Sequence, residues 1–159
     1  MGKDILKIVD SLGRERYRSI IIHAPPEMGP RCSNFGKRLA ERSGGQYVDL
    51  LDYFIQHPEL SEQIDRYGLE RLTTLIMDIF NGEPLLVIDR ADFLLDTWRK
   101  KERMAFYRLI EKQWDSYMRG REAILVFGLQ TSVEIEALSD SRSWAGERIF
   151  SLSDLDDIS

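Results

Sequence analysis

The sequence predicts an α/β fold with a parallel sheet of about five strands, helices on both faces and one helix before the first strand. Two observations carry this prediction. Short apolar runs alternate with longer segments of helical period, and the runs are rich in branched side chains. Such runs are typical of strands covered on both faces, as in a parallel sheet. The expected strands are residues 19–23, 46–50, 85–89, 123–127 and 148–152.

Helices are expected where apolar residues recur at the spacing of one helix face. Ile5, Val9 and Leu12 share such a face, and Gly13 follows where a left-handed cap would end the helix. The remaining expected helices are residues 33–42, 69–80, 97–118 and 133–138, whereas residues 51–60 show no decisive pattern. Residues 1–159 are therefore expected to form a single domain, with a leading helix at 1–13 and an α/β core at 19–155.

The composition disfavours several classes of function. With 22 Lys and Arg against 27 Asp and Glu, the net charge is −5, which argues against a polybasic binder of nucleic acids or membranes. The one cysteine, Cys32, excludes a disulfide framework within the chain, and the two histidines have no second metal ligand at a suitable spacing. No apolar run is long enough to span a membrane. We therefore expect a cytoplasmic protein that does not bind membranes and whose partner is another protein.

The segment after the first strand has the position of a phosphate-binding loop but lacks its residues. That loop, G-x-x-x-x-G-K-[ST], needs glycines so that amides approach the phosphates, a Lys for the β/γ-phosphates and a Ser or Thr for magnesium. Counted from the strand end, only Gly29 matches, and a shift of two residues puts Cys32 and Ser33 in the places of the Lys and the Ser/Thr. Three prolines within residues 25–30 also remove amide donors. These losses favour a rigid connection without nucleotide.

The third expected strand ends in an acid. Four apolar residues, 85–88, precede Asp89, which is the Walker B pattern that holds magnesium in P-loop NTPases. The next position, which in a hydrolytic site holds a carboxylate that orients water, is Arg90, so only Asp92 could take that role. An Asp at a strand end can also simply cap the helix that follows.

Five segments taken in order carry a resemblance: IIIHAPPEMGPRCS, NFGKRLAERSGG, LLVIDRADFLLD, AILVFGLQTS and ERIFSLSDL. Together they resemble the minimal AAA+-type P-loop proteins, and in particular the small P-loop subunit of BREX phage-defence systems, the BrxF family. The resemblance covers residues 20–155 and implies a P-loop NTPase-like fold with no lid domain. Because the Gly-Lys-Thr of family members with intact motifs is missing here, nucleotide binding does not carry over.

By position, the resemblance also implies roles for individual residues. Asp89 would hold magnesium if a magnesium nucleotide bound. The degenerate nucleotide loop and the sensor at the end of the fourth strand would be Gly29, Arg31, Cys32, Ser33 and Gln130 or Thr131. Arg142 or Arg148 would be an arginine finger that reaches the nucleotide of an adjacent subunit.

These observations predict a catalytically degenerate subunit, not an enzyme in its own right and without a cofactor. It would bind a larger ATPase or further copies of itself in a DNA-associated defence complex, and would contact DNA only there. Two alternatives stay open: a weak ATPase that binds ATP and Mg²⁺ through Asp89, and a stand-alone regulatory module of flavodoxin-like strand order. The assembly surface would be the loop around Trp144 or the helix at residues 3–12, unless that helix docks on its own sheet.

Overall fold

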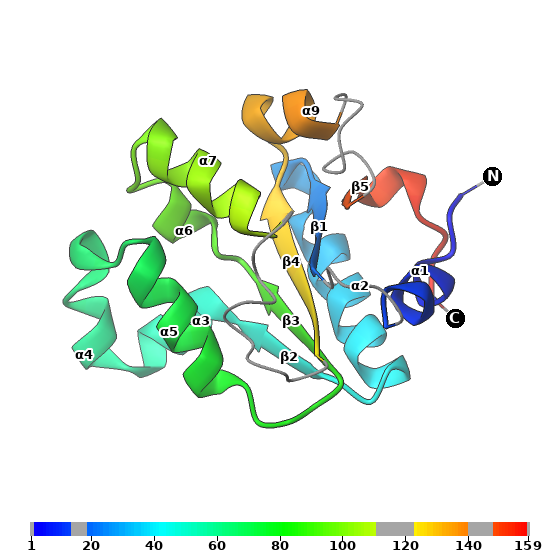
Figure 1. Cartoon of the computed structure of the whole chain (residues 1–159), viewed down its shortest axis with the longest axis horizontal. Coiled ribbons are helices and arrows are strands. Elements are labelled where there is room, and N and C mark those ends of the chain that lie inside the picture. Colours follow the sequence, from blue (N-terminus) through cyan, green and yellow to red (C-terminus); the bar gives the residue numbers. More distant parts are fainter. Residues whose placement is uncertain (1, 14–18, 111–122, 140–147, 159) are drawn as a thin grey trace.

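The computed structural model has one five-stranded, entirely parallel sheet (Figure 1). The structure describes residues 2–13, 19–110, 123–139 and 148–158. The strands are β1 (Ser19–Ala24), β2 (Gln46–Asp49), β3 (Leu85–Asp89), β4 (Ile124–Gln130) and β5 (Ile149–Ser151). All five lie where the sequence predicts them, and β4 runs on to Gln130, beyond its predicted end.

The strand order across the sheet is β2-β3-β4-β1-β5. In the flavodoxin-like order, 2-1-3-4-5, β1 lies between β2 and β3. Here β1 instead pairs with β4 and β5, and β4 separates it from β3. The flavodoxin-like alternative is therefore wrong in its strand order. The predicted fold class, a P-loop NTPase-like parallel sheet with flanking helices and a leading helix, is confirmed.

The helices differ from the prediction mainly at their ends. They are α1 (Ile5–Leu12), α2 (Gly29–Arg42), α3 (Leu50–Gln56), α4 (Pro58–Ser61), α5 (Leu69–Ile79), α6 (Asp92–Leu95), α7 (Lys100–Arg108) and α9 (Val133–Ser139). The undecided segment 51–60 forms most of α3 and α4. The predicted helix at 97–118 corresponds to α7, and its part beyond residue 110 lies outside the described residues.

Two apolar layers cover the two faces of the sheet. α1 and α2 lie on one side, while α3, α5 and α7 lie on the other (Figure 1). Successive side chains of a strand point to opposite faces, so Ile20 and Ile22 of β1 join the α1/α2 layer and Ile21 joins the other. All three are at most 2% exposed, as expected for a central strand. In the second layer, the indole of Trp98 donates a hydrogen bond to the carbonyl of Tyr67 at 2.6 Å.

The leading helix α1 docks within the chain. Its apolar face, Ile5, Val9 and Leu12, is buried beside α2, so the docking interpretation of this helix is confirmed. Asp4 caps the helix by accepting a hydrogen bond from the amide of Leu6. Gly13 has a φ of −59°, so the predicted left-handed cap is wrong. Among the described residues, no helix combines the length and apolar character needed to cross a membrane.

Candidate functional site

The connection from β1 to α2 is a tight turn rather than an open cradle. Residues Pro26–Met28 form one turn of 3-10 helix, and the amide of Met28 donates to the carbonyl of Pro25 at 2.9 Å. The amide of Gly29 likewise donates to the carbonyl of Pro26, and α2 begins at Gly29 instead of the predicted Ser33. Since these amides are engaged and prolines have none, the turn lacks the row of N–H donors that holds phosphates.

Ser33 contacts Asp89 directly. Its hydroxyl donates a hydrogen bond to Oδ2 of the carboxylate at 2.6 Å. The two residues thus lie together as the shifted alignment of the motif requires, because the Ser/Thr and the acid of a P-loop share one magnesium ion. Cys32, in the place of the Lys, is buried, and burial raises the pKa of its thiol to about 12. A neutral thiol cannot replace the charge of a lysine.

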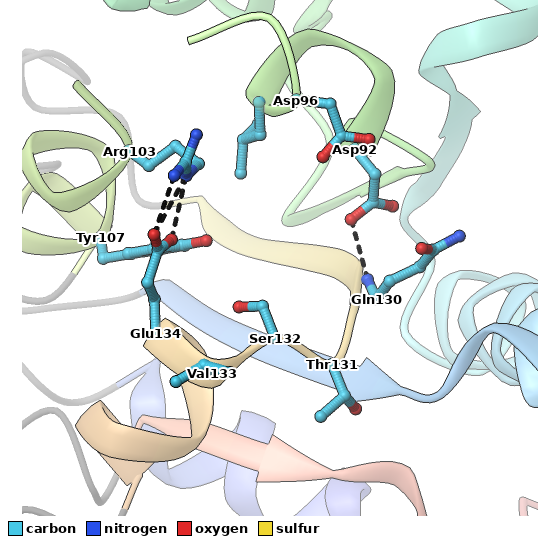
Figure 2. A pocket seen from close by; sticks show the side chains of 10 residues that line it. Asp92, Asp96, Arg103, Tyr107, Gln130, Thr131, Ser132, Val133 and Glu134 are labelled. Carbon is cyan, nitrogen blue, oxygen red and sulfur yellow. Dashed lines mark hydrogen bonds and ion pairs between the residues drawn. The ribbon is translucent and has the colours of Figure 1, made fainter. Parts of the chain in front are cut away.

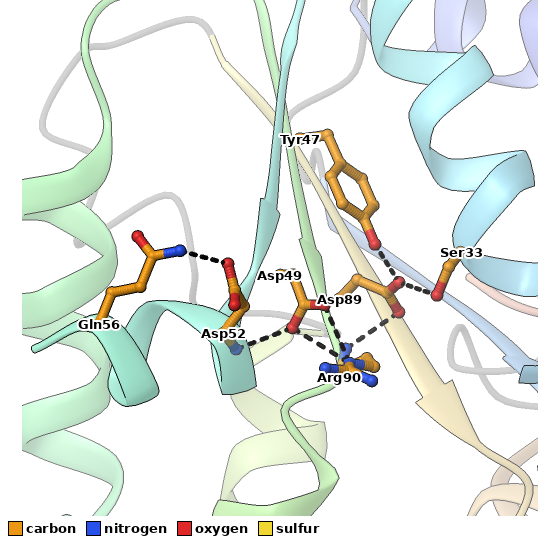
Figure 3. A network of polar contacts seen from close by, with 7 residues as sticks. All are labelled: Ser33, Tyr47, Asp49, Asp52, Gln56, Asp89 and Arg90. Atoms are coloured by element: carbon orange, nitrogen blue, oxygen red, sulfur yellow. Dashed lines mark hydrogen bonds and ion pairs between the residues drawn. The ribbon is translucent and has the colours of Figure 1, made fainter. Parts of the chain in front are cut away.

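Three hydrogen bonds from the chain itself hold the carboxylate of Asp89, which is 5% exposed (Figure 3). The hydroxyl of Tyr47 donates to Oδ2 at 2.5 Å, and the amide of Arg90 donates to Oδ1 at 2.9 Å. Burial and the bond to Asp89 raise the pKa of Tyr47, so its phenol keeps the proton it donates. A Cβ on Gly128 would lie 2.5 Å from Oδ1, so only glycine leaves room for this carboxylate.

Arg90 stands at the sequence position where a hydrolytic site has its second carboxylate, and its side chain forms an ion pair with Asp49. Its φ of 57° lies in the left-handed region, which is uncommon for a residue other than glycine. Its Nε lies 3.0 Å from Oδ2 of Asp49, at the end of the neighbouring strand β2 (Figure 3). Asp49 also accepts a hydrogen bond from the amide of Asp52 and so caps α3. The ion pair therefore joins the ends of β2 and β3 at the rim of the site.

Asp92 and Gln130 connect the ends of β3 and β4. Oδ1 of Asp92 accepts a hydrogen bond from the backbone amide of Gln130 at 2.9 Å (Figure 2). Burial raises the pKa of Asp92 to about 6, against the effect of that bond. Thr131, the other sensor candidate, makes a 2.8 Å hydrogen bond with Nδ1 of His23. The carboxylate of Asp92 thus has a positioning contact with the backbone.

A cavity of about 290 Å³ lies at the carboxyl ends of the strands. It brings together most of the residues that the sequence singled out: Gly29, Cys32, Ser33, Asp89, Asp92 and Gln130. Asp96 adds a third carboxylate, and Arg90 is the basic residue among the lining residues. An excess of carboxylates repels the phosphates of a nucleotide. Among the described residues there is no group of three or more His, Cys, Asp or Glu side chains placed to hold a metal ion.

A second cavity, of about 330 Å³, adjoins the first through Asp92, Asp96 and Gln130 (Figure 2). On its other side, Arg103 of α7 forms a paired contact with Glu134 of α9, at 2.9 Å from Nη2 to Oε1 and 3.0 Å from Nε to Oε2. Both side chains are mostly buried, so this ion pair fixes α7 against α9 beside the site.

Two of the predicted site residues, Arg31 and Arg148, lie outside the strand-end cavity. Arg31 does not line the strand-end cavity; it lines a groove between α2 and the segment after β5. Arg148 is 4% exposed, and its carbonyl accepts a hydrogen bond from the amide of Ile21. A guanidinium that is buried in its own chain is poorly placed to reach a neighbouring subunit, and the arginine-finger role of Arg148 stays a prediction. Arg142 and Trp144 lie outside the described residues.

Sequence reasoning missed Tyr47, which completes the shell around Asp89. Tyr47 and Asp49 are two residues apart on β2 and so share one face of the strand. β2 pairs in register with β3, and Asp49 lies opposite Asp89. The available signal was a tyrosine two residues before the aspartate that ends the strand, but it gains meaning only once β2 is known to lie beside β3.

Fold and site together define a P-loop NTPase-like α/β protein whose loop and acid are occupied by the chain's own contacts. No protein-family model matches the sequence, and no curated protein matches it. Among solved structures, the chain is similar to the one titled "Structure of C. elegans PCH-2", with 14% sequence identity and a TM-score of 0.47. The similarity covers 96% of this chain and 42% of that chain. A similarity of this size carries no inference about function.

Proposed function

We propose that this chain is a degenerate P-loop subunit that does not use nucleotide and acts by binding other proteins. The observation that carries the proposal is that three donors of the chain itself hold the carboxylate of Asp89. Ser33 and Tyr47 both donate to Oδ2, and the amide of Arg90 donates to Oδ1. A magnesium ion would have to displace these donors, and no lysine is present at the motif position to compensate the charge of the phosphates.

The first test is a calorimetric titration of the purified chain with ATP and Mg²⁺. We expect no saturable binding at the affinity usual for P-loop proteins. A Kd of about 10 μM or tighter, equivalent to about −7 kcal/mol, would refute the proposal and favour the weak ATPase. In that case Asp89→Asn should abolish the binding, whereas Glu134→Gln, outside the strand-end cavity, should leave it unchanged.

The partner we propose is a larger ATPase or further copies of this chain, within a DNA-associated phage-defence complex. Support comes from the resemblance to the BREX subunit, since a subunit without its own nucleotide needs another protein through which to act. Light scattering on the chain alone and after co-expression with the products of neighbouring genes tests this. A chain that stays monomeric and captures no product of its neighbouring genes would contradict assembly.

Within such a complex, Arg142 is proposed to reach the nucleotide of the partner ATPase. An arginine supplied to a neighbour contributes about 10³–10⁵ in rate, and lysine is a poor replacement for its planar guanidinium. Arg142→Lys should therefore lower the ATPase rate of the complex, while Arg99→Lys, at an exposed position before α7, should not. If the complex assembles and Arg142→Lys stimulates like wild type, the subunit is purely architectural.

A further inference from the structure

A groove separate from the strand-end cavity lies between α2 and the segment that follows β5. Its volume is about 450 Å³, compared with about 290 Å³ for the strand-end cavity. Apolar side chains from both sides line it: Met28 and Phe35 near and on α2, and Leu152 and Leu155 after β5. Phe35 is 4% exposed and each of the two leucines 8%, so these side chains belong to the packed core and form a firm apolar floor.

The rim of the groove is basic on the side of α2. The charged residues of this helix are Arg31, Lys37, Arg38, Arg42 and a single acid, Glu41, and all five are exposed. The chain as a whole carries a net charge of −5. Of the charged residues of α2, Arg31 and Arg38 line the groove, together with Asp157 from the segment after β5. The α2 side of the groove is therefore positively charged in a chain of negative net charge, and such local positive charge attracts and orients a negatively charged partner.

The contacts of the two groove arginines indicate the group they bind. Nη1 of Arg38 lies 3.1 Å from Oδ1 of Asp157, a residue of the chain's own C-terminal segment. The two side chains of this pair are 51% and 79% exposed, so the contact is weak and open to competition. Arg31, also on the rim, has no hydrogen bond or ion pair with any residue in the part of the chain that the structure describes. Nη1 of Arg38 also donates a hydrogen bond to the carbonyl of Ile158, at 3.5 Å. The guanidinium of Arg38 is thus held by an exposed ion pair and one long hydrogen bond, and the guanidinium of Arg31 is available.

We propose that this groove binds an acidic peptide segment of a partner protein, with an apolar side chain against Phe35 and Leu155 and carboxylates on Arg31 and Arg38. Asp157 competes for Arg38 and so weakens the binding. The contact with the acidic segment specifies one of the protein-binding surfaces proposed above. It does not depend on whether the strand-end cavity binds nucleotide. A nucleic acid fits the groove less well, because its phosphates gain nothing from the apolar floor.

Fluorescence anisotropy with labelled ten-residue peptides tests this on the full chain. The probe alternates glutamate with leucine; one control peptide carries serine in place of leucine, and another carries lysine in place of glutamate. We expect saturable binding of the first peptide with a Kd of about 100 μM or tighter and much weaker binding of both controls. A labelled single-stranded oligonucleotide of similar length is measured in parallel.

Variants distinguish specific binding of the peptide in the groove from nonspecific electrostatic attraction to the chain. Arg31→Ala should weaken binding about fivefold to tenfold, because a contact between ionised groups is lost. Asp157→Asn should strengthen binding about twofold to fivefold, because it removes the ion pair that competes for Arg38. Arg99→Ala, which removes the same charge at an exposed position before α7, should have no effect. Thermal melts confirm that each variant is folded.

Four results would overturn the proposal: no saturable binding of the glutamate–leucine peptide, equal binding of the serine peptide, an unchanged Kd for Arg31→Ala, or an oligonucleotide that binds more tightly than the peptide in a way that depends on Arg31. The last result would assign the basic face to nucleic acid instead. None of these outcomes depends on the ATP titration, so the failure of this inference and of the proposed function are distinguishable.

Discussion

Tyr47 donates a hydrogen bond to the buried carboxylate of Asp89, and Tyr47→Phe tests how much this contact stabilises the fold. The substitution keeps the ring between β2 and α2 and removes only the hydroxyl that donates to Oδ2. The remaining donor to this oxygen is Ser33, at 2.6 Å. The buried charge therefore loses one of its two side-chain donors while the packing stays the same.

The magnitude follows from the burial of the pair. A hydrogen bond to a charged group contributes about 1.5–3 kcal/mol, and an unsatisfied buried partner accounts for much of its loss. Asp89 is 5% exposed but Tyr47 is only half-buried, and Ser33 remains, so we expect the lower part of this range, about 1.5–2 kcal/mol. For a chain of 159 residues this corresponds to a fall in Tm of about 3–8 °C.

The assay is urea and thermal denaturation followed by circular dichroism, with Tyr53→Phe as the matched control. The ring of Tyr53 stacks on His57, and its hydroxyl has no hydrogen-bond partner among the described residues. We expect the control to change the free energy of unfolding by less than about 0.5 kcal/mol. A double-mutant cycle of Tyr47→Phe with Asp89→Asn should show coupling of at least about 1 kcal/mol.

The pH dependence gives an independent check. Burial and the bond to Asp89 raise the pKa of Tyr47 above its ordinary value of 10.0, so above that pH the folded chain binds more protons than the unfolded chain. The stability contributed by Tyr47 is therefore complete below pH 10 and falls as pH rises further. Plotted against pH, the free energies of unfolding of wild type and Tyr47→Phe should converge above pH 10. Equal stability of the two proteins at pH 7, or parallel curves above pH 10, would refute the reasoning.

Two further substitutions test the geometry of the sheet ends. Burial raises the pKa of Asp92 to about 6, so the contribution of Asp92 to stability falls as pH rises from 4 to 6. The stability of Asp92→Asn relative to wild type should therefore be greater at pH 7 than at pH 4, by about 1–2 kcal/mol after a discount for partial exposure. Urea denaturation at both pH values measures this, and a constant difference contradicts it. Gly45→Ala should destabilise by about 2 kcal/mol or more, because its Cβ would lie 2.4 Å from the carbonyl oxygen of Leu85. Gly29→Ala, where a Cβ meets nothing within 4 Å, is the matched control and should change stability by less than about 1 kcal/mol.

The strands and the place of the candidate site were predictable because both depend on local patterns. Branched apolar runs define buried strands, and in a parallel sheet the polar residues that follow them meet at one edge. This is why Ser33, Asp89, Asp92 and Gln130 were found together in advance. The residues that line the strand-end cavity were thus recognisable from their positions after β1, β3 and β4.

The contacts around Asp89 and the position of Arg31 depend on the strand order and on one helix start, neither of which follows from periodicity. Tyr47 reaches Asp89 only because β2 lies next to β3. α2 begins at Gly29 because prolines at 26 and 30 favour helical starts, and this early start carries Arg31 into the groove beside Leu155. The burial of Arg148 likewise depends on the packing of β5 against β1, which no local pattern records.

The pairing of β1 has a consequence for how the chain acquires its structure. Both neighbours of this strand come late in the sequence: Ser19 pairs with Leu125, and Ile21 pairs with Ile149. Contacts between residues so far apart slow folding, because a long loop must close before either pair forms. During synthesis, the run Ile20–Ile22 emerges long before β4 and β5 exist to cover its edges. A nascent chain that stops short of β4 therefore presents a bare apolar strand, which is a template for aggregation and a natural ligand for a chaperone.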